Sequence, residues 1–265
     1  MLPTIPAVPP VLNVAAYRFV DIDDPAALRE RLYGSARAAG LLGPVLIAPE
    51  GINLVLAGAP TALRDWLAQL RQDDRFADLE DKESSSAEPP FRRLRVRLKR
   101  EIIRMNHPAV RPAVGRAPAV DASTLARWLV TGRCDAGRPL ALLDTRNAFE
   151  VDAGAFEGAI DWRLKQFSDF PAALDAHRAE LEGKTVVSYC TGGIRCEKAA
   201  LLMHERGLPH VLQLDGGILK YFEATRGAPH WRGDCVVFDD RVALTPLLAP
   251  VPQAEHDEAA VAHAS

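Results

Sequence analysis

Residues 186–200, VVSYCTGGIRCEKAA, decide how the second half of this chain folds. The run is typical of a buried strand, a short glycine-containing loop and a helix, with Cys190 at the first loop position. We expect the loop to turn backbone N–H groups inward as it enters the helix, which favours negative charge there. The loop residues that form this anion cradle are Thr191, Gly192, Gly193 and Ile194.

Cys190 stands where a thiol becomes reactive. A thiol at a helix N-terminus has a lowered pKa and is partly thiolate near neutral pH. Arg195 adds a fixed positive charge to the same loop. A buried cysteine is usually only a small apolar side chain, but such a cysteine needs no glycine pair or arginine behind it. The loop therefore predicts an anion held on, or next to, the sulfur of Cys190.

Two other interpretations of the loop fit less well. Five residues separate Cys190 from Cys196, whereas zinc sites favour roughly two to four and a second Cys/His pair nearby. No Gly-Lys-Ser/Thr follows, as a nucleotide-binding phosphate loop would require. We therefore predict no metal site. Cys196, one helical turn from the loop start, is either a packed helix residue or a resolving thiol.

Length and composition indicate a globular protein in a reducing compartment. The chain has 265 residues, of which 48% are hydrophobic and 25% charged, and a net charge of −3. This length suits one large or two ordinary domains. Four cysteines are too few for a disulfide framework. We expect no signal peptide, no membrane partner and a cytoplasmic location.

The N-terminal half predicts a ferredoxin-like α+β domain over residues 11–106. Its elements alternate as strand, helix, strand, strand, helix, strand. Residues 1–10, which contain four prolines, are predicted to be a flexible lead-in. Thr61 is the predicted cap of the second helix. The strands are expected near residues 13–20, 45–48, 54–57 and 92–103, and the helices near 24–39 and 61–72.

The last of these strands carries a basic stripe. Apolar and basic residues alternate over 93–99, and no acidic residue interrupts 91–100. Alternate side chains of a strand face opposite sides, so we expect Leu94, Val96 and Leu98 in the core. The stripe is either a solvated face or a contact for an RNA phosphate backbone, unless acidic residues from 73–88 cover it. The candidate RNA-binding residues are Arg93, Arg95, Arg97 and Lys99.

The second half predicts an α/β domain with a mainly parallel central sheet. Residues 107–120, with three prolines, suggest a linker. Strands and helices then alternate over 121–245, which includes a C-terminal extension, and this order implies a sheet covered on both faces. Cys190 is expected at the carboxyl ends of the strands, where ligands bind. Residues 246–265 are predicted to be a disordered tail.

These motifs resemble those of a known fold. The loop at 190–196, CTGGIRC, resembles the active-site loop of rhodanese domains, in which the first cysteine carries a persulfide. Residues 144–150 and 154–159 resemble the segment after the first rhodanese strand, with Ala155 where many members have histidine. Residues 214–218 resemble the closing strand and turn. The residues we expect to hold the loop's neighbours by ion pairing are Asp144, Arg146 and Glu150.

The whole chain resembles the oxygen-dependent tRNA uridine hydroxylase family. The resemblance rests on residues 48–53, APEGIN, and 231–241, WRGDCVVFDDR, together with the rhodanese motifs. It implies a tRNA partner, hydroxylation of the wobble uridine at carbon 5 and molecular oxygen as co-substrate, and no other cofactor is evident. The chain departs from the family at residues 54–55, where many members have Gly-Thr. It also lacks the cysteine-rich C-terminal extension of many members.

Three classes of function remain open at this stage. The first is a tRNA-modifying enzyme with Cys190, Arg195 and Cys196 as its catalytic set; Cys134 and Cys235 are taken as bystanders. The second is a sulfurtransferase with a persulfide on Cys190. A rhodanese-fold phosphatase is less well supported, because it would need five residues between cysteine and arginine and this chain has four. The third is a binding module without activity, although such modules usually lack the cysteine.

Overall fold

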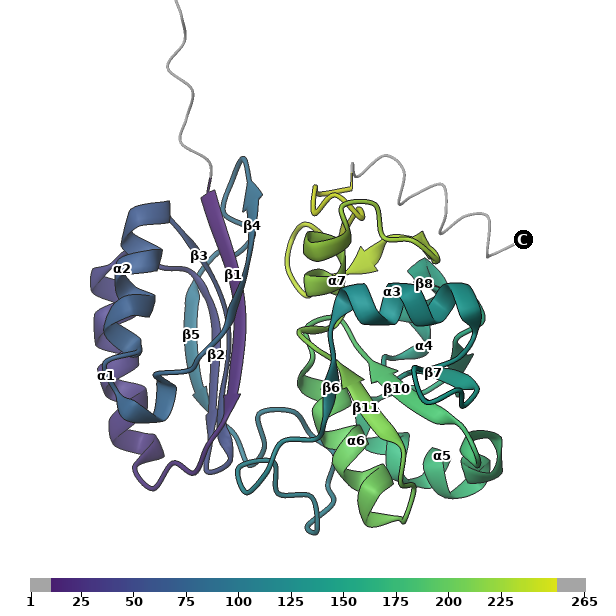
Figure 1. Ribbon diagram of the computed structural model, residues 1–265. Helices are drawn as coiled ribbons and strands as arrows, with labels where there is room; N and C mark the ends of the chain where they lie inside the picture. Colours follow the sequence, from purple (N-terminus) through teal and green to yellow (C-terminus); the bar gives the residue numbers. More distant parts are fainter. Residues whose placement is uncertain (1–10, 252–265) are drawn as a thin grey trace, which may run out of the picture. The chain divides into compact units, whose positions relative to one another are not determined.

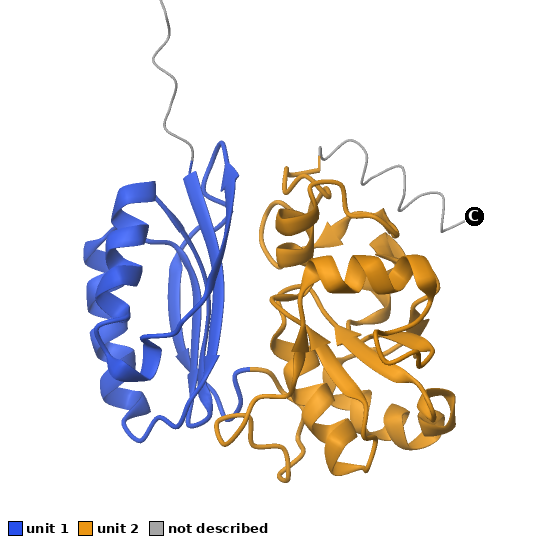
Figure 2. Ribbon diagram, viewed as in Figure 1, with its two compact units in different colours: residues 1–102 blue, residues 103–265 orange. Residues whose placement is uncertain are grey.

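The computed structural model describes residues 11–251 and divides into two compact units, residues 1–102 and 103–265 (Figure 2). We call them unit 1 and unit 2. The predicted lead-in, 1–10, and residues 252–265 of the predicted tail lie outside the described residues. The division falls a few residues before the predicted domain end at 106.

Unit 1 is a five-stranded sheet with two helices on one face (Figure 1). The strand order is β4-β1-β3-β2-β5, and a core that includes Leu28, Leu54 and Trp66 fills the space between sheet and helices. A single 3-10 turn, Asp74–Phe76, precedes the fourth strand. The elements are β1 (Val11–Phe19), α1 (Pro25–Ala38), β2 (Gly43–Ala48), β3 (Gly51–Gly58), α2 (Pro60–Leu70), β4 (Asp81–Ser86) and β5 (Leu94–Leu98).

The fourth strand of the ferredoxin-like pattern is not the one predicted. It is β4, from the acidic segment, which pairs antiparallel with β1. The predicted final strand is a fifth, edge strand that pairs parallel with β2 and covers 94–98 instead of 92–103. Leu98, predicted in the core, is 46% exposed because it ends this short edge strand, whereas Val96 is buried.

Helix α2 also begins differently from the prediction. It starts at Pro60 after Ala59, without a side-chain cap, so Thr61 is not its cap. Proline suits the first helical turn because its missing N–H would have no partner there.

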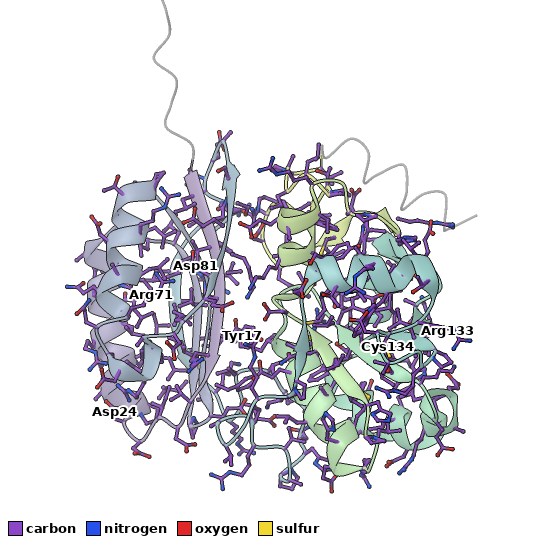
Figure 3. The ribbon with its side chains drawn as sticks, in the orientation of Figure 1. Tyr17, Asp24, Arg71, Asp81, Arg133 and Cys134 are labelled. Carbon is purple, nitrogen blue, oxygen red and sulfur yellow. The ribbon has the colours of Figure 1, made fainter. Side chains whose placement is uncertain are left out.

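The acidic segment does not cover the basic stripe. In the order of the sheet, β4 and β5 are opposite edges. The carboxylates of the segment pair with arginines elsewhere in unit 1: Asp81 with Arg71 (Figure 3), and Glu83 with Arg64 at 2.6 Å. The predicted alternative, in which these acids cancel the stripe, is therefore wrong.

Unit 2 is built on a parallel five-stranded sheet of order β6-β11-β10-β7-β9. Val186 belongs to the core shared with α5 and α6, and Val187 to the core shared with α3 and α7, because neighbouring side chains of a strand face opposite sides. The main elements are β6 (Ala119–Val120), α3 (Ala122–Thr131), β7 (Leu140–Asp144), α4 (Ala148–Ala153), β9 (Ile160–Asp161), α5 (Phe170–His177), β10 (Thr185–Tyr189), α6 (Ile194–Glu205), β11 (Val211–Leu214) and α7 (Gly217–Thr225).

Short elements complete unit 2. The antiparallel pair β8–β12 ties the C-terminal extension to the rest of the unit. The pair β13–β14 lies within the extension itself. Helix α5 has a 3-10 turn at each end. Helix α3 is capped by Asp121, which accepts the N–H of Thr124 at 2.9 Å. The short strands are β8 (Gly154–Phe156), β12 (Trp231–Gly233), β13 (Cys235–Val236) and β14 (Ala243–Leu244).

Two segments predicted to lack packing are packed. The predicted linker 107–120 places Val110 and Ala117 in the core of unit 2 and ends in strand β6. The start of the predicted tail also packs, because Val251 is buried and donates its N–H to Ala243 at 3.1 Å. In both places isolated apolar residues between prolines reach the core, although they form no periodic pattern along the chain.

Candidate active site

The loop that carries Cys190 lies at the carboxyl end of β10. Cys190 follows directly after that strand, and α6 begins at Ile194, as the sequence predicts. Gly193 takes a positive φ of 100° at the N-terminus of α6, a conformation that suits glycine. Its backbone N–H donates to Sγ of Cys190 at 3.2 Å. This amide is the member of the predicted anion cradle that contacts the sulfur.

Helix α7 holds the same loop from the other side. The N–H of Ile218 donates to the carbonyl of Cys190 at 3.0 Å, and that of Leu219 to the carbonyl of Thr191 at 3.1 Å. Gly217 has a φ of 68°, and a Cβ there would lie 2.4 Å from the Cys190 carbonyl oxygen and 2.7 Å from the Gly193 nitrogen. Sequence reasoning identified this turn only by its resemblance to rhodaneses and missed its direct packing against the loop.

Several groups act on the pKa of Cys190. Burial raises this pKa, whereas the neighbouring Cys196 thiol, the positive charge of Arg195 and the backbone amides of Arg195 and Cys196 lower it. The lowering effects outweigh burial, so the pKa lies well below the ordinary value of a cysteine. Cys190 is therefore set up to be a thiolate near neutral pH.

Cys196 lies close to Cys190 but has the opposite character. The two Sγ atoms are 3.9 Å apart. The thiol of Cys196 donates to the carbonyl oxygen of Gly193, with 3.0 Å between Sγ and the oxygen. Burial and the neighbouring Cys190 raise the pKa of Cys196 well above its ordinary value. Cys196 therefore stays a neutral thiol that contacts the carbonyl of Gly193, the residue whose own N–H donates to Cys190.

Arg195 and Glu150 form a buried, two-pronged ion pair. Nη1 lies 2.6 Å from Oε2 and Nη2 lies 2.7 Å from Oε1 of Glu150. Burial raises the pKa of Glu150, but the hydrogen bonds and charge of Arg195 lower it by more, so the net shift is downward and the carboxylate is charged. Nη2 of Arg195 also lies 3.4 Å from the hydroxyl oxygen of Thr191. Glu150 neutralises much of the charge of Arg195. Arg195 therefore holds the loop in place in addition to giving it positive charge.

A second buried ion pair supports the first. Arg146 donates to Asp144, with Nη2 2.6 Å from Oδ2, and both side chains are fully buried. Its guanidinium also donates to the carbonyl oxygens of Glu150 and Gly154 at 3.2 and 2.6 Å. This pair connects the end of β7 to both ends of α4, which carries Glu150.

The two remaining cysteines lie in different surroundings. Cys134 accepts a hydrogen bond from the hydroxyl of Thr185, at the start of β10. Cys235 is buried near Arg146 and Thr191, and burial raises its pKa to about 12. Sequence reasoning did not place Cys235 beside the active loop. Its high pKa keeps it protonated, so it is not a nucleophile there.

Cys190 has no exposed surface in this structure. A substrate therefore reaches the sulfur of Cys190 only after the residues that cover it have moved.

Between residues 11 and 251, no three His, Cys, Asp or Glu side chains gather as a metal site. No helix in the same range is long and apolar enough to cross a membrane.

The predicted RNA-binding residues belong to unit 1, not to the unit that carries Cys190. Arg93, Arg95, Arg97 and Lys99 are all exposed. The charge of Arg93, together with burial and the charge of Arg97, lowers the pKa of Arg95, which shows that the three guanidinium groups repel one another. Among the described residues, none of the four side chains forms an ion pair. We call these four residues the basic edge.

The fold and the loop define a rhodanese-type protein with an acylphosphatase-like domain before it. The family model of the UPF0176 acylphosphatase like domain matches residues 11–102, and that of the rhodanese-like domain matches residues 125–224.

Curated relatives share most of this chain. A tRNA uridine(34) hydroxylase of Variovorax paradoxus is 66% identical over 90% of both chains. A protein of the same name from Bordetella avium is 63% identical over 91% of this chain and 99% of its own, and one from Delftia acidovorans is 58% identical over 92% of each. The chain belongs to the tRNA uridine(34) hydroxylase family.

Proposed function

We propose that this protein is a tRNA-modifying enzyme that hydroxylates uridine 34, the wobble position, at carbon 5 with molecular oxygen as co-substrate. One observation carries the proposal. A chain that matches relatives named for this reaction over about 90% of its length keeps a cysteine poised as a thiolate, with its Sγ 3.2 Å from the Gly193 amide. A module that only binds RNA would have no need of such a thiol.

The thiolate of Cys190 supplies a nucleophile for the uracil ring. Its addition to carbon 6 forms a C–S bond, and the electron pair of the C5–C6 double bond moves onto carbon 5, where the C4 carbonyl stabilises it. Carbon 5 then bonds to one oxygen atom of O2, and the reductant cleaves the O–O bond so that the other oxygen atom leaves as water. Loss of the C5 proton expels the thiolate and restores the double bond.

The overall reaction needs a reductant. Uridine, one O2, two electrons and two protons give 5-hydroxyuridine and one water. Two thiols, which become a disulfide, or another two-electron donor supply the electrons. Arg195 and the loop amides stabilise the anionic sulfur before attack and after release.

The basic edge is the proposed contact for the tRNA backbone. Its side chains are exposed and, among residues 11–251, carry no ion pair. Alternate residues of a strand repeat at about 7 Å, so the charges form a regular row along β5. A row of unneutralised arginines releases counterions when it binds phosphates. The carboxylates of β4, at the opposite edge of the sheet, are paired with Arg71 and Arg64 and leave the charge of the basic edge uncancelled.

We place the reaction in the cytoplasm. All four cysteines are free thiols, which supports a reducing compartment.

Nucleoside mass spectrometry tests the proposed function. Transfer RNA is taken from cells lacking the gene, restored with wild type, Cys190→Ala or Cys134→Ala. We expect 5-hydroxyuridine derivatives with wild type and Cys134→Ala, and none with Cys190→Ala. If their level does not depend on the gene while purified protein moves sulfur from thiosulfate to cyanide, a sulfurtransferase with a persulfide on Cys190 replaces this proposal.

A further inference from the structure

Two phenylalanine side chains are exposed on unit 2. Phe149 is 53% and Phe238 63% exposed, and no other Phe, Tyr or Trp of this unit is exposed in the described part of the chain. The other aromatics are mostly buried, as in the cluster of Phe156, Tyr221 and Trp231. Burying a phenylalanine is favourable by about 1.5–3 kcal/mol, so two exposed neighbouring rings need a reason.

The two rings are neighbours although they lie 89 positions apart in the chain. Their centroids are 6.5 Å apart and their planes meet at 86°. In such an edge-to-face pair the edge of one ring meets the face of the other, so flat apolar surface remains open. The pair forms a corner of two perpendicular planes, which suits a flat ligand.

Both rings are anchored in the active site. Phe149 precedes Glu150, which is held by Arg195. The Arg195 guanidinium carbon lies 6.0 Å from the centre of the Phe238 ring. Arg195 lies in the first turn of α6, directly after the loop that presents Cys190.

The turn that carries Phe238 is held in place by its own hydrogen bonds. Arg241 donates to both carboxylate oxygens of Asp239, at 2.8 and 2.6 Å. The N–H of Val237 closes the turn on the carbonyl of Val242 at 2.9 Å. Because the backbone of the turn is already ordered, it loses little conformational entropy when a ligand stacks on Phe238.

We propose that Phe149 and Phe238 form a stacking site for an unpaired nucleobase of the RNA, next to the uridine that reacts at Cys190. The inference rests on the proposed function, because that function brings a single-stranded RNA loop to this site. Proteins recognise such loops by stacking splayed bases on aromatic rings. An enzyme that reacts at a base must also take it out of its stack. The neighbouring base then loses a stacking partner, and stacking on Phe149 and Phe238 replaces that interaction.

The test uses full-length protein and an anticodon stem–loop RNA with 2-aminopurine at position 35, beside uridine 34. Phe149→Ala, Phe238→Ala and the double variant are compared with wild type. We expect the dissociation constant to rise about 5- to 150-fold for each stacking ring that is removed. The 2-aminopurine quenching on binding should disappear, and KM for hydroxylation should rise while kcat changes little.

Matched variants separate stacking from general apolar contact. Phe238→Trp keeps a flat ring and should bind like wild type, whereas Phe238→Leu keeps only apolar volume and should bind like Phe238→Ala. Val130→Ala removes another exposed apolar side chain of unit 2, 75% exposed on α3, and should change nothing. Thermal unfolding checks that each variant is folded.

The outcomes for the two proposals are distinct. If wild type hydroxylates the RNA and the phenylalanine variants bind with unchanged affinity and quenching, the stacking site is refuted and the proposed function stands. Equal binding by Phe238→Leu and wild type also refutes stacking. If wild type forms no 5-hydroxyuridine, the proposed function fails, while the quenching still shows whether a base stacks here.

Discussion

Glu150 holds Arg195 by two parallel contacts of 2.6 and 2.7 Å, and the side chains are 0% and 7% exposed. The two residues are 45 positions apart in the chain. The contact joins α4 to the first turn of α6, so it fixes the loop that lies between β10 and α6. The pair therefore holds the segment that follows Cys190 in place.

Loss of this pair should destabilise the protein. Glu150→Gln leaves the Arg195 charge buried without its partner, and we expect the free energy of unfolding to fall by about 3–5 kcal/mol. Chemical denaturation measures it. The control is Glu157→Gln, which breaks the exposed contact with Arg232 and should have little effect. Equal, small changes in both variants would show that the buried pair does not support the loop.

The lowered pKa of Cys190 predicts an acid limit to activity. The thiolate form is populated above the lowered pKa and is lost as pH falls through it. Activity should therefore be full at neutral pH and decline only in acid. Ultraviolet thiolate absorbance of wild type minus that of Cys190→Ala gives the titration directly. A midpoint at or above about 8.5, the value of a free cysteine, would contradict the site geometry.

Gly217 should tolerate no side chain. A Cβ there meets the backbone of Cys190 and Gly193 at less than 3 Å, so Gly217→Ala should displace the loop and abolish activity. Gly132 has nearly the same φ, 66°, but nothing lies within 4 Å of its Cβ position. Gly132→Ala is therefore the control: it adds only the strain of a left-handed backbone, about 1–2 kcal/mol, and no steric clash. Equal activity of the two variants would show that the close approach of Gly217 to the loop is unimportant.

Cys196 should act as a positioning residue. Cys196→Ser keeps a donor for the Gly193 carbonyl and should retain most activity, whereas Cys196→Val loses the donor and should shift the acid limit upward. Steady-state kinetics over a pH series measures both effects. Complete inactivity of Cys196→Ser, together with a Cys190–Cys196 disulfide in oxidised wild type, would identify Cys196 as a redox partner instead.

The basic edge should contribute salt-dependent affinity. Replacing Arg95 and Arg97 by Gln should weaken tRNA binding and reduce the slope of log affinity against log salt by about 0.7–0.9 for each phosphate that is no longer bound. Arg64→Gln removes the same charge where Glu83 already neutralises it, so it should leave the slope unchanged. Filter binding over a salt series measures both. Equal slopes for all variants would exclude β5 as the RNA-binding strand.

Local patterns were enough to predict much of this protein. The buried strand β10, the glycine loop after it and the start of α6 all depend on neighbours in the chain, and the structure has them where expected. Motifs also identified Asp144, Arg146, Glu150 and Cys190 as a group. The two-domain order and the parallel sheet followed from the succession of strands and helices.

Other features depended on which segments meet in space. The positions of β4 and β5 at opposite edges, the packing of 107–120 and the approach of Gly217 to Cys190 all join residues far apart in the chain. Arg195 looked like a free charge because its partner Glu150 lies on another helix. Phe149 and Phe238 likewise form a pair only after α4 and the β13–β14 turn come together. Such contacts result from burial and charge pairing over the whole unit, and no periodicity along the chain encodes them.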